Sequence, residues 1–159
     1  MRLNSKGKIG AAGNVTVIVH KPDGSQESIN LTNTYTTAWL NAIRNSWKNA
    51  GLADLQIKYM AWGSNNTAES AAHTKLLAEF GRKQITSQAE GLDGELITTV
   101  YVSPEEGTES TIEEIGWFGG PDASEDADTG IMVARVLYSR AKTNLESLDI
   151  VRTDSMEEK

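Results

Sequence analysis

The stretch that most constrains the fold of this chain runs from Ile112 to Gly120. It is a short apolar run with two adjacent carboxylates near its start and three glycines in its second half. Neighbouring side chains of a strand point to opposite faces, so Glu113 and Glu114 cannot both flank one chemical bond. The stretch therefore predicts a buried strand that ends in a tight glycine turn, rather than a catalytic carboxylate pair.

The clearest hairpin lies in the first part of the chain. Asn14–His20 is rich in β-branched residues and is predicted to be a strand, with Gln26–Leu31 as its returning partner. Between them, Pro22 presets its φ angle and Gly24 accepts a positive one, as a tight turn requires. Further strands are predicted at Leu55–Gly63, Lys83–Ala89, Glu95–Ser103, Ile131–Tyr138 and Leu145–Val151.

Two segments have the apolar spacing of helices. A long helix is predicted over Tyr35–Asn49, because Trp39, Ile43 and Trp47 recur at every fourth position. These tryptophans are expected to anchor the helix on a sheet, with a ligand platform as the alternative. A short helix is predicted over Thr74–Phe80.

Together these elements predict a mainly β, antiparallel fold. We expect a jelly-roll-like β-sandwich with one long and one short helix. A doubly wound α/β fold is excluded, because helices do not alternate with strands after residue 82. We expect a flexible N-terminal arm at 1–13, one domain at 14–152 and a disordered tail at 153–159.

The composition of the chain limits its function. The net charge is −7 and the basic residues are scattered singly, so nucleic acid is not an expected partner. No apolar run approaches the about 20 residues of a membrane helix, so a membrane is not expected either. The chain has no cysteine, which excludes disulfides, zinc–thiolate sites and cysteine nucleophiles and fits folding in a reducing cytoplasm.

No constellation of residues indicates catalysis, a cofactor or a metal. His20 and His73 are the only histidines, and no serine elbow accompanies them. The glycines after Ile115 lack the lysine of a phosphate-binding loop. Asp126–Gly130 has acidic alternation but no following glutamate, so it matches a calcium loop poorly. We predict a non-enzymatic protein, with a glycan hydrolase as a remote alternative.

A set of motifs occurs in one order along residues 14–150. The motifs begin with the hairpin at Pro22–Gly24 and with Asn33 ahead of a helix. They continue with Tyr59–Ser64 and Thr67-Ala68, then Leu76, Leu77, Glu79 and Arg82 ahead of Ile85-Thr86, then Ile112–Gly120, Thr129–Arg135 and Lys142-Thr143. In this order the chain resembles small structural virion proteins of tailed bacteriophages. Trp62 and Trp117 depart from the pattern, which usually has smaller or aliphatic residues there.

The resemblance implies a virion protein, made in the host cytoplasm, whose partners are other tail or capsid proteins. It implies a tail-fibre or baseplate adaptor that assembles as a symmetric oligomer, most simply a trimer. A capsid decoration protein is the first alternative, and a receptor- or carbohydrate-binding module is the second. No shaft follows the last predicted strand, so we expect a compact adaptor or decoration protein rather than a complete tail fibre.

Two groups of residues follow from this interpretation. Partner contacts are expected from the N-terminal arm, one tryptophan and the acidic loop, namely Lys6, Lys8, Trp62, Asp122, Glu125, Asp126 and Asp128. Buried carboxylates need cationic partners. A structural ion pair is therefore expected among Glu79, Arg82, Glu114 and Arg135.

Overall fold

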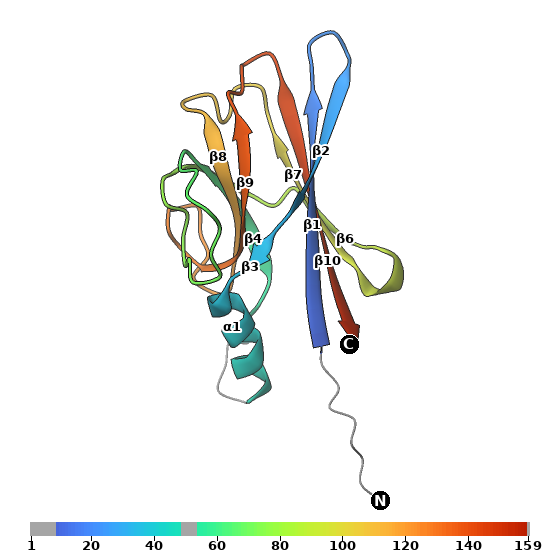
Figure 1. Ribbon diagram of the computed structural model, residues 1–159, viewed down its shortest axis with the longest axis vertical. Helices are drawn as coiled ribbons and strands as arrows, with labels where there is room; N and C mark the ends of the chain where they lie inside the picture. The colour runs from blue at the N-terminus through green and yellow to red at the C-terminus, as the bar shows by residue number, and fades with distance from the viewer. Residues whose placement is uncertain (1–8, 49–53, 159) are drawn as a thin grey trace, which may run out of the picture.

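The computed structural model describes residues 9–48 and 54–158, and these residues form two antiparallel sheets (Figure 1). The first sheet has the strand order β2 (Gln26–Thr32), β1 (Ile9–His20), β10 (Ser147–Glu158), β7 (Leu96–Val102) and β6 (Ser87–Glu90). The second has the order β3 (Thr34–Tyr35), β9 (Ile131–Arg140), β8 (Ile112–Gly119), β4 (Ile57–Gly63) and β5 (Glu79–Gln84). The prediction of a mainly β, antiparallel fold is confirmed.

The two sheets share one hydrophobic core, as the layers of a sandwich do. Side chains alternate along each strand, and in the second half of β1 this buries Val15, Val17 and Val19. The cluster includes Val15, Val17, Val100 and Ile150 of the first sheet and Met60, Ile115, Trp117 and Val133 of the second. The strand order does not confirm a jelly roll, because consecutive strands pair as simple hairpins at β1–β2, β4–β5, β6–β7 and β8–β9.

The outer face of the second sheet is also covered. Phe118 and Met132 point outward there and pack with Leu76, which belongs to the loop between β4 and β5. This second, smaller core explains why β8 and β9 are almost continuously apolar. At the end of β8, Gly120 has a φ of +87°, which confirms the predicted glycine turn.

One α-helix lies among the described residues. This helix, α1, spans Thr37–Trp47 and therefore lies within the predicted range. Thr36 is its N-cap, because the side-chain oxygen accepts a hydrogen bond from the Trp39 N–H at 3.1 Å. A single 3₁₀ turn, η1 (Leu92–Gly94), joins β6 to β7.

The predicted helix over Thr74–Phe80 is wrong. Its first residues form an irregular loop, and Glu79 and Phe80 begin β5. The backbone N–H groups of Leu77 and Ala78 donate to the buried carboxylate of Glu114, at 3.1 and 2.8 Å. These N–H groups are therefore satisfied by a side chain rather than by helical carbonyls.

The predicted strand Lys83–Ala89 is in fact two strands. Lys83 belongs to β5 and pairs with Met60 of β4, whereas Ser87 begins β6 and pairs with Thr99 of β7. The chain crosses from one sheet to the other between them. No polarity change marks this crossing, which is why the sequence pattern suggested a single strand.

The folded domain extends further at both ends than the predicted range 14–152. Residues 9–13, expected in a flexible arm, begin β1, and residues 153–158, expected in a disordered tail, end β10. The two segments pair with each other, from Ile9 with Glu158 to Asn14 with Thr153. Each segment supplies hydrogen-bond partners along one side of the other, so neither is marked by an apolar alternation of its own. Residues 1–8 and 159 lie outside the described residues.

Candidate partner-binding surface

The first sheet extends beyond the second at the end of the molecule where α1 lies (Figure 1). β1 and β10 pair as far as Ile9 and Glu158, but β2 pairs with β1 only from Asn14, and β7 pairs with β10 only to Asp154. Residues 9–13 and 154–158 therefore form a protruding two-stranded segment, called here the terminal ribbon. Isolated two-stranded ribbons have marginal stability, so this one is expected to have a further contact.

A groove opens between the terminal ribbon and α1, where the two layers of the sandwich separate. Its volume is about 560 Å³. One wall is Ala11, Leu96 and Met156 of the first sheet, and the other is Leu40, Ile43 and Trp47 of α1. We call it the end groove. Trp39 and Val133, which belong to the core, form its floor.

Large apolar side chains gather around the end groove. The exposed fraction is 46% for Leu40, 71% for Trp47 and 65% for Met156, and all three line the groove. Leu92, in the η1 turn next to the groove residue Gly94, is 83% exposed. Such a concentration of water-exposed apolar surface is typical of a binding site.

The base of α1 fixes one wall of the groove. Thr36 is fully buried, its N–H donates to the Val133 carbonyl at 3.0 Å, and its hydroxyl donates to the Met132 carbonyl. These bonds attach the first turn of α1 to β9. The helix then runs away from the sheets (Figure 1). Trp39 near its start is buried, whereas Trp47, its last residue, is largely exposed.

A polar cluster lies at the inner end of the groove. Arg152 is fully buried, with its Nε 2.8 Å from Asp154 Oδ2 and its Nη2 2.6 Å from Asp154 Oδ1. Its guanidinium stacks between the rings of Tyr35 and Trp117. The Tyr35 hydroxyl donates to Asp154, and burial, together with that carboxylate, raises the pKa of Tyr35 well above its ordinary value. This pairing neutralises Asp154.

Acidic residues border the groove on the β6–β7 side. Glu90, Asp93 and Glu95 surround the η1 turn, and we call them the acidic rim. None of the three forms an ion pair within the part of the chain that the structure describes. The site thus combines an apolar groove with uncompensated negative charge at its edge.

The prediction of Trp62 as a partner contact is wrong. Its exposed fraction is 4%, and it packs in the core between the sheets. A register shift in β4 between Ile57 and Tyr59 turns Trp62 inward, while the loop after β4 covers the opposite face. The chain therefore offers no exposed tryptophan at this position.

The acidic loop is exposed, as a partner contact requires, but it is also firmly attached. Asp122, Glu125, Asp126 and Asp128 all face solvent. Arg82 donates to the Thr129 carbonyl at 2.9 Å and pairs with Glu79 at 2.7 Å. Lys6 and Lys8, the other predicted contacts, lie outside the described residues.

The structure also brings together Glu114 and Arg135. Arg135 Nε lies 2.6 Å from Glu114 Oε2, and both side chains are almost completely buried. The other guanidinium nitrogens donate to the carbonyls of Thr67 and Asn65. The four residues expected to supply an ion pair therefore form two pairs, and each pair fixes a loop on the outer face of the second sheet.

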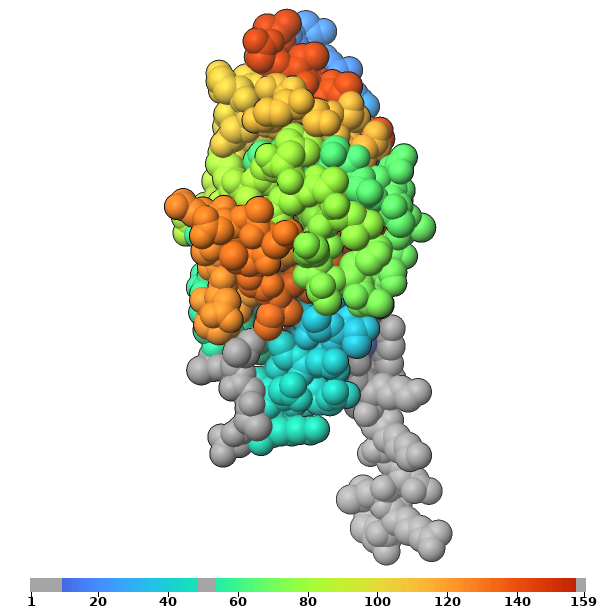
Figure 2. All heavy atoms as spheres, turned by 90° about the vertical axis from the view of Figure 1, so that its left-hand side faces the viewer, coloured from blue at the N-terminus to red at the C-terminus, as the bar shows by residue number. Residues whose placement is uncertain are grey.

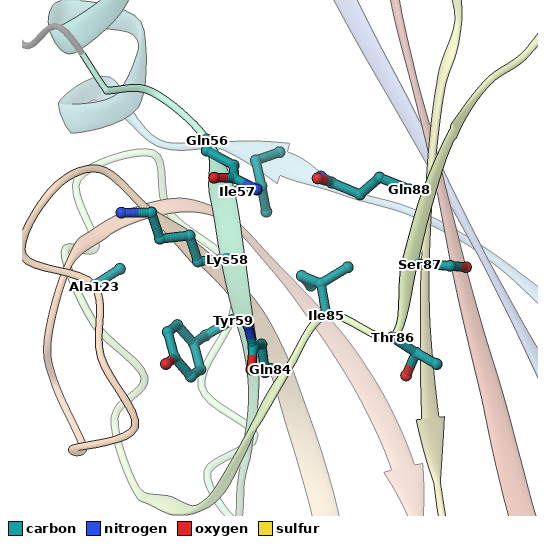
Figure 3. A pocket seen from close by; sticks show the side chains of 10 residues that line it. All are labelled: Gln56, Ile57, Lys58, Tyr59, Gln84, Ile85, Thr86, Ser87, Gln88 and Ala123. Atoms are coloured by element: carbon teal, nitrogen blue, oxygen red, sulfur yellow. The ribbon is translucent and has the colours of Figure 1, made fainter.

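A second, polar pocket lies where the chain crosses from β5 to β6 (Figure 3). Its volume is about 400 Å³. Gln88 points from β6 toward Gln56 and Ile57, and Tyr59 and Gln84 lie below them (Figure 3). Amides and a phenol can bind polyols, but this pocket has no exposed tryptophan on which a sugar ring would stack.

The chain matches no protein-family model, no curated protein and no solved structure. Among residues 9–48 and 54–158, no helix is long and apolar enough to cross a membrane. Within the same ranges, no group of three or more histidine or acidic side chains is arranged to hold a metal ion.

The residues of the end groove were not predicted from the sequence. Trp47 was expected in the core, with a ligand platform as the alternative, because it continues the spacing of Trp39 and Ile43. Met156 was assigned to a disordered tail. The one available signal was the length of α1, whose last turn has no sheet to pack against.

Proposed function

We propose that this protein is a non-enzymatic structural component of a tailed-phage virion. It acts as a tail-fibre or baseplate adaptor that assembles as a symmetric oligomer, and its sequence motifs support this class of protein. A capsid decoration protein is the alternative within the same class. The trimeric state is part of the proposal and comes from the sequence resemblance.

The end groove is the observation that carries the proposal. Aromatic and methionine side chains are enriched at protein–protein interfaces, and Trp47 and Met156 are both largely exposed there. Covering them stabilises a complex by about 25 cal/mol per Å² of apolar surface removed from water. The bound partner is therefore a protein surface. Contact between copies of the chain would bury this apolar surface in every subunit of a symmetric oligomer.

The oligomeric mass of a groove variant tests this proposal. Leu40→Glu combined with Trp47→Glu places charge on the groove wall without touching the core. We expect the unmodified chain to have a mass that is a multiple of 17.3 kDa by light scattering, and the variant to be monomeric.

Leu145→Glu is the matched control. Leu145 is 67% exposed and lies in the β9–β10 connection, at the opposite end of the molecule (Figure 1). This variant should keep the mass of the unmodified chain. An oligomeric Leu40→Glu/Trp47→Glu variant would exclude the end groove as the assembly contact.

The location within the virion is tested by particle binding. We expect the purified protein to co-sediment with tails or baseplates that lack it, and not with capsids. Co-sedimentation with capsids alone would select the decoration alternative.

The polar pocket favours one candidate from another class, a receptor- or carbohydrate-binding module. Gln56, Gln84 and Gln88 supply amides that donate and accept hydrogen bonds. A glycan array tests this function, with Gln84→Ala/Gln88→Ala as the variant that should lose binding. Absence of any glycan signal from the oligomeric protein would reject it.

A further inference from the structure

The N-terminal segment of the chain has the composition and position of a ligand for the end groove of another copy. Residues 1–8 precede β1, and β1 begins at the mouth of the groove, where Ala11 forms part of the wall. We propose that residues 1–8 of a second copy of this chain bind in the end groove as an added strand beside the end of β10. The inference rests on the proposed assembly into oligomers and names the segment that mediates it.

The edge of the first sheet offers backbone groups to such a strand. β7 pairs with β10 only to Asp154, so residues 155–158 of β10 have no partner on that side within the described residues. An added strand would continue the sheet there through main-chain hydrogen bonds. The η1 turn itself packs against β10, so the added strand would lie past that turn, next to the exposed side chains of Leu92 and Met156.

Charge distinguishes residues 1–8 from the rest of the chain. They contain Arg2, Lys6 and Lys8 and no acidic residue, which leaves 12 basic against 22 acidic residues in the remainder. The acidic rim, Glu90, Asp93 and Glu95, has no cationic partner in the described structure. A basic segment therefore complements this edge, whereas the rest of an acidic second copy would be repelled.

The apolar content of residues 1–8 fits the groove as well. Met1 and Leu3 are the large apolar residues within an otherwise polar and basic stretch. One aliphatic anchor flanked by cations matches an apolar groove with an acidic rim.

A charge-exchange experiment tests the inference. The double substitution Lys6→Glu/Lys8→Glu reverses the charge at two positions of residues 1–8. Glu90→Lys/Glu95→Lys reverses the charge at two positions of the acidic rim. We expect each variant alone to raise the dissociation constant of the oligomer on the order of tenfold, as measured by light scattering across a dilution series. Chains that carry all four substitutions should return close to the unmodified value.

The outcomes separate this inference from the proposed function. Glu125→Lys/Asp126→Lys changes the same charge on the exposed acidic loop and should leave the dissociation constant unchanged. If the unmodified chain is oligomeric but the four substitutions together do not restore association, the docking of residues 1–8 is wrong while assembly stands. A monomeric unmodified chain would overturn both.

A disulfide test determines which copy supplies the segment. The chain has no cysteine, so tagged Leu3→Cys chains can be co-expressed with untagged Leu92→Cys chains. We expect a mixed disulfide between tagged and untagged chains, and none when Leu145→Cys replaces Leu92→Cys. Absence of the mixed disulfide, or an internal disulfide in the Leu3→Cys/Leu92→Cys double variant without cross-linked chains, would overturn docking between copies.

Discussion

At the scale of single residues, buried ion pairs fix the loops that cover the second sheet. Glu114 accepts from Arg135 and from two backbone N–H groups, so its carboxylate joins β8, β9 and the loop before β5. Arg82 similarly joins β5 to the acidic loop and lies over the ring of Phe118 at 4.1 Å. These pairs replace the hydrogen bonds that regular structure would otherwise supply to the loops.

Removal of one partner should be costly. Arg135→Ala leaves the fully buried Glu114 carboxylate without its cation, and we expect a loss of about 3–5 kcal/mol in the free energy of unfolding by urea denaturation. Replacement of both residues, as Glu114→Gln/Arg135→Met, should cost less than Arg135→Ala alone. Lys75→Ala breaks an exposed pair with Asp128 and should cost less than about 1 kcal/mol. A similar loss for Arg135→Ala and Lys75→Ala would contradict the importance of the buried pair.

The carboxylate of Glu146 predicts that the stability of the fold depends on pH. The hydrogen bonds from Arg140 lower the pKa of Glu146 below its ordinary value. The folded state therefore holds fewer protons than the unfolded state as the pH falls past about 4.3, and stability decreases there. Glu146→Gln should cost about 1.5 kcal/mol at pH 7 and progressively less as acid protonates the native carboxylate. A cost that does not change between pH 7 and pH 3 would show that this pair does not titrate as described.

At the scale of elements, α1 links the core to the end groove. Thr36 caps the helix and also bonds to two carbonyls of β9, so it sets the direction in which α1 leaves the sheet. The wall formed by Leu40, Ile43 and Trp47 depends on this anchor.

Loss of the cap should destabilise the helix. Thr36→Ala removes the acceptor of the Trp39 N–H and leaves the Met132 carbonyl without that donor, and we expect a loss of about 2 kcal/mol in chemical denaturation. Thr37→Ala is the matched control, because the Thr37 side chain is exposed, and should change stability by less than about 0.5 kcal/mol. Equal effects of the two variants would rule out the anchoring role of Thr36.

The elements themselves were predictable where local chemistry determines them. The turn at Pro22 and Gly24 specified the first hairpin, and the spacing of Trp39, Ile43 and Trp47 specified α1. Thr74–Phe80 was mistaken for a helix because its apolar spacing is helical. In the structure the N–H groups of Leu77 and Ala78 are satisfied by Glu114, which is distant in sequence. The ends of β1 and β10 were missed because each depends on the other, across nearly the whole length of the chain.

The candidate site was less predictable than the fold. Trp62 was expected at the surface, but both faces of the second sheet are covered, and only the tertiary structure places a loop over the outer face. Trp47 carries the same helical spacing as Trp39, and only the length of α1 relative to the sheet leaves it exposed. A pattern identifies an apolar face, but the neighbouring elements determine whether that face is buried.

At the scale of the whole molecule, α1 and the terminal ribbon lie at the same end of the sandwich (Figure 1). The end groove opens between them, with the acidic rim beside it. In the view turned by 90°, the loops that cover the second sheet face the reader and α1 projects below them (Figure 2). Assembly at the α1 end therefore leaves the covered face of the second sheet in contact with solvent.

The mass of the unmodified chain in solution is the decisive test of assembly through the end groove. Light scattering across a concentration series should give a stable multiple of 17.3 kDa, and three copies would agree with the proposed trimer. The mass should fall toward one copy on dilution in the Leu40→Glu/Trp47→Glu variant before it does so in the unmodified chain. A strict monomer at high concentration would contradict the proposal that this protein assembles through its end groove.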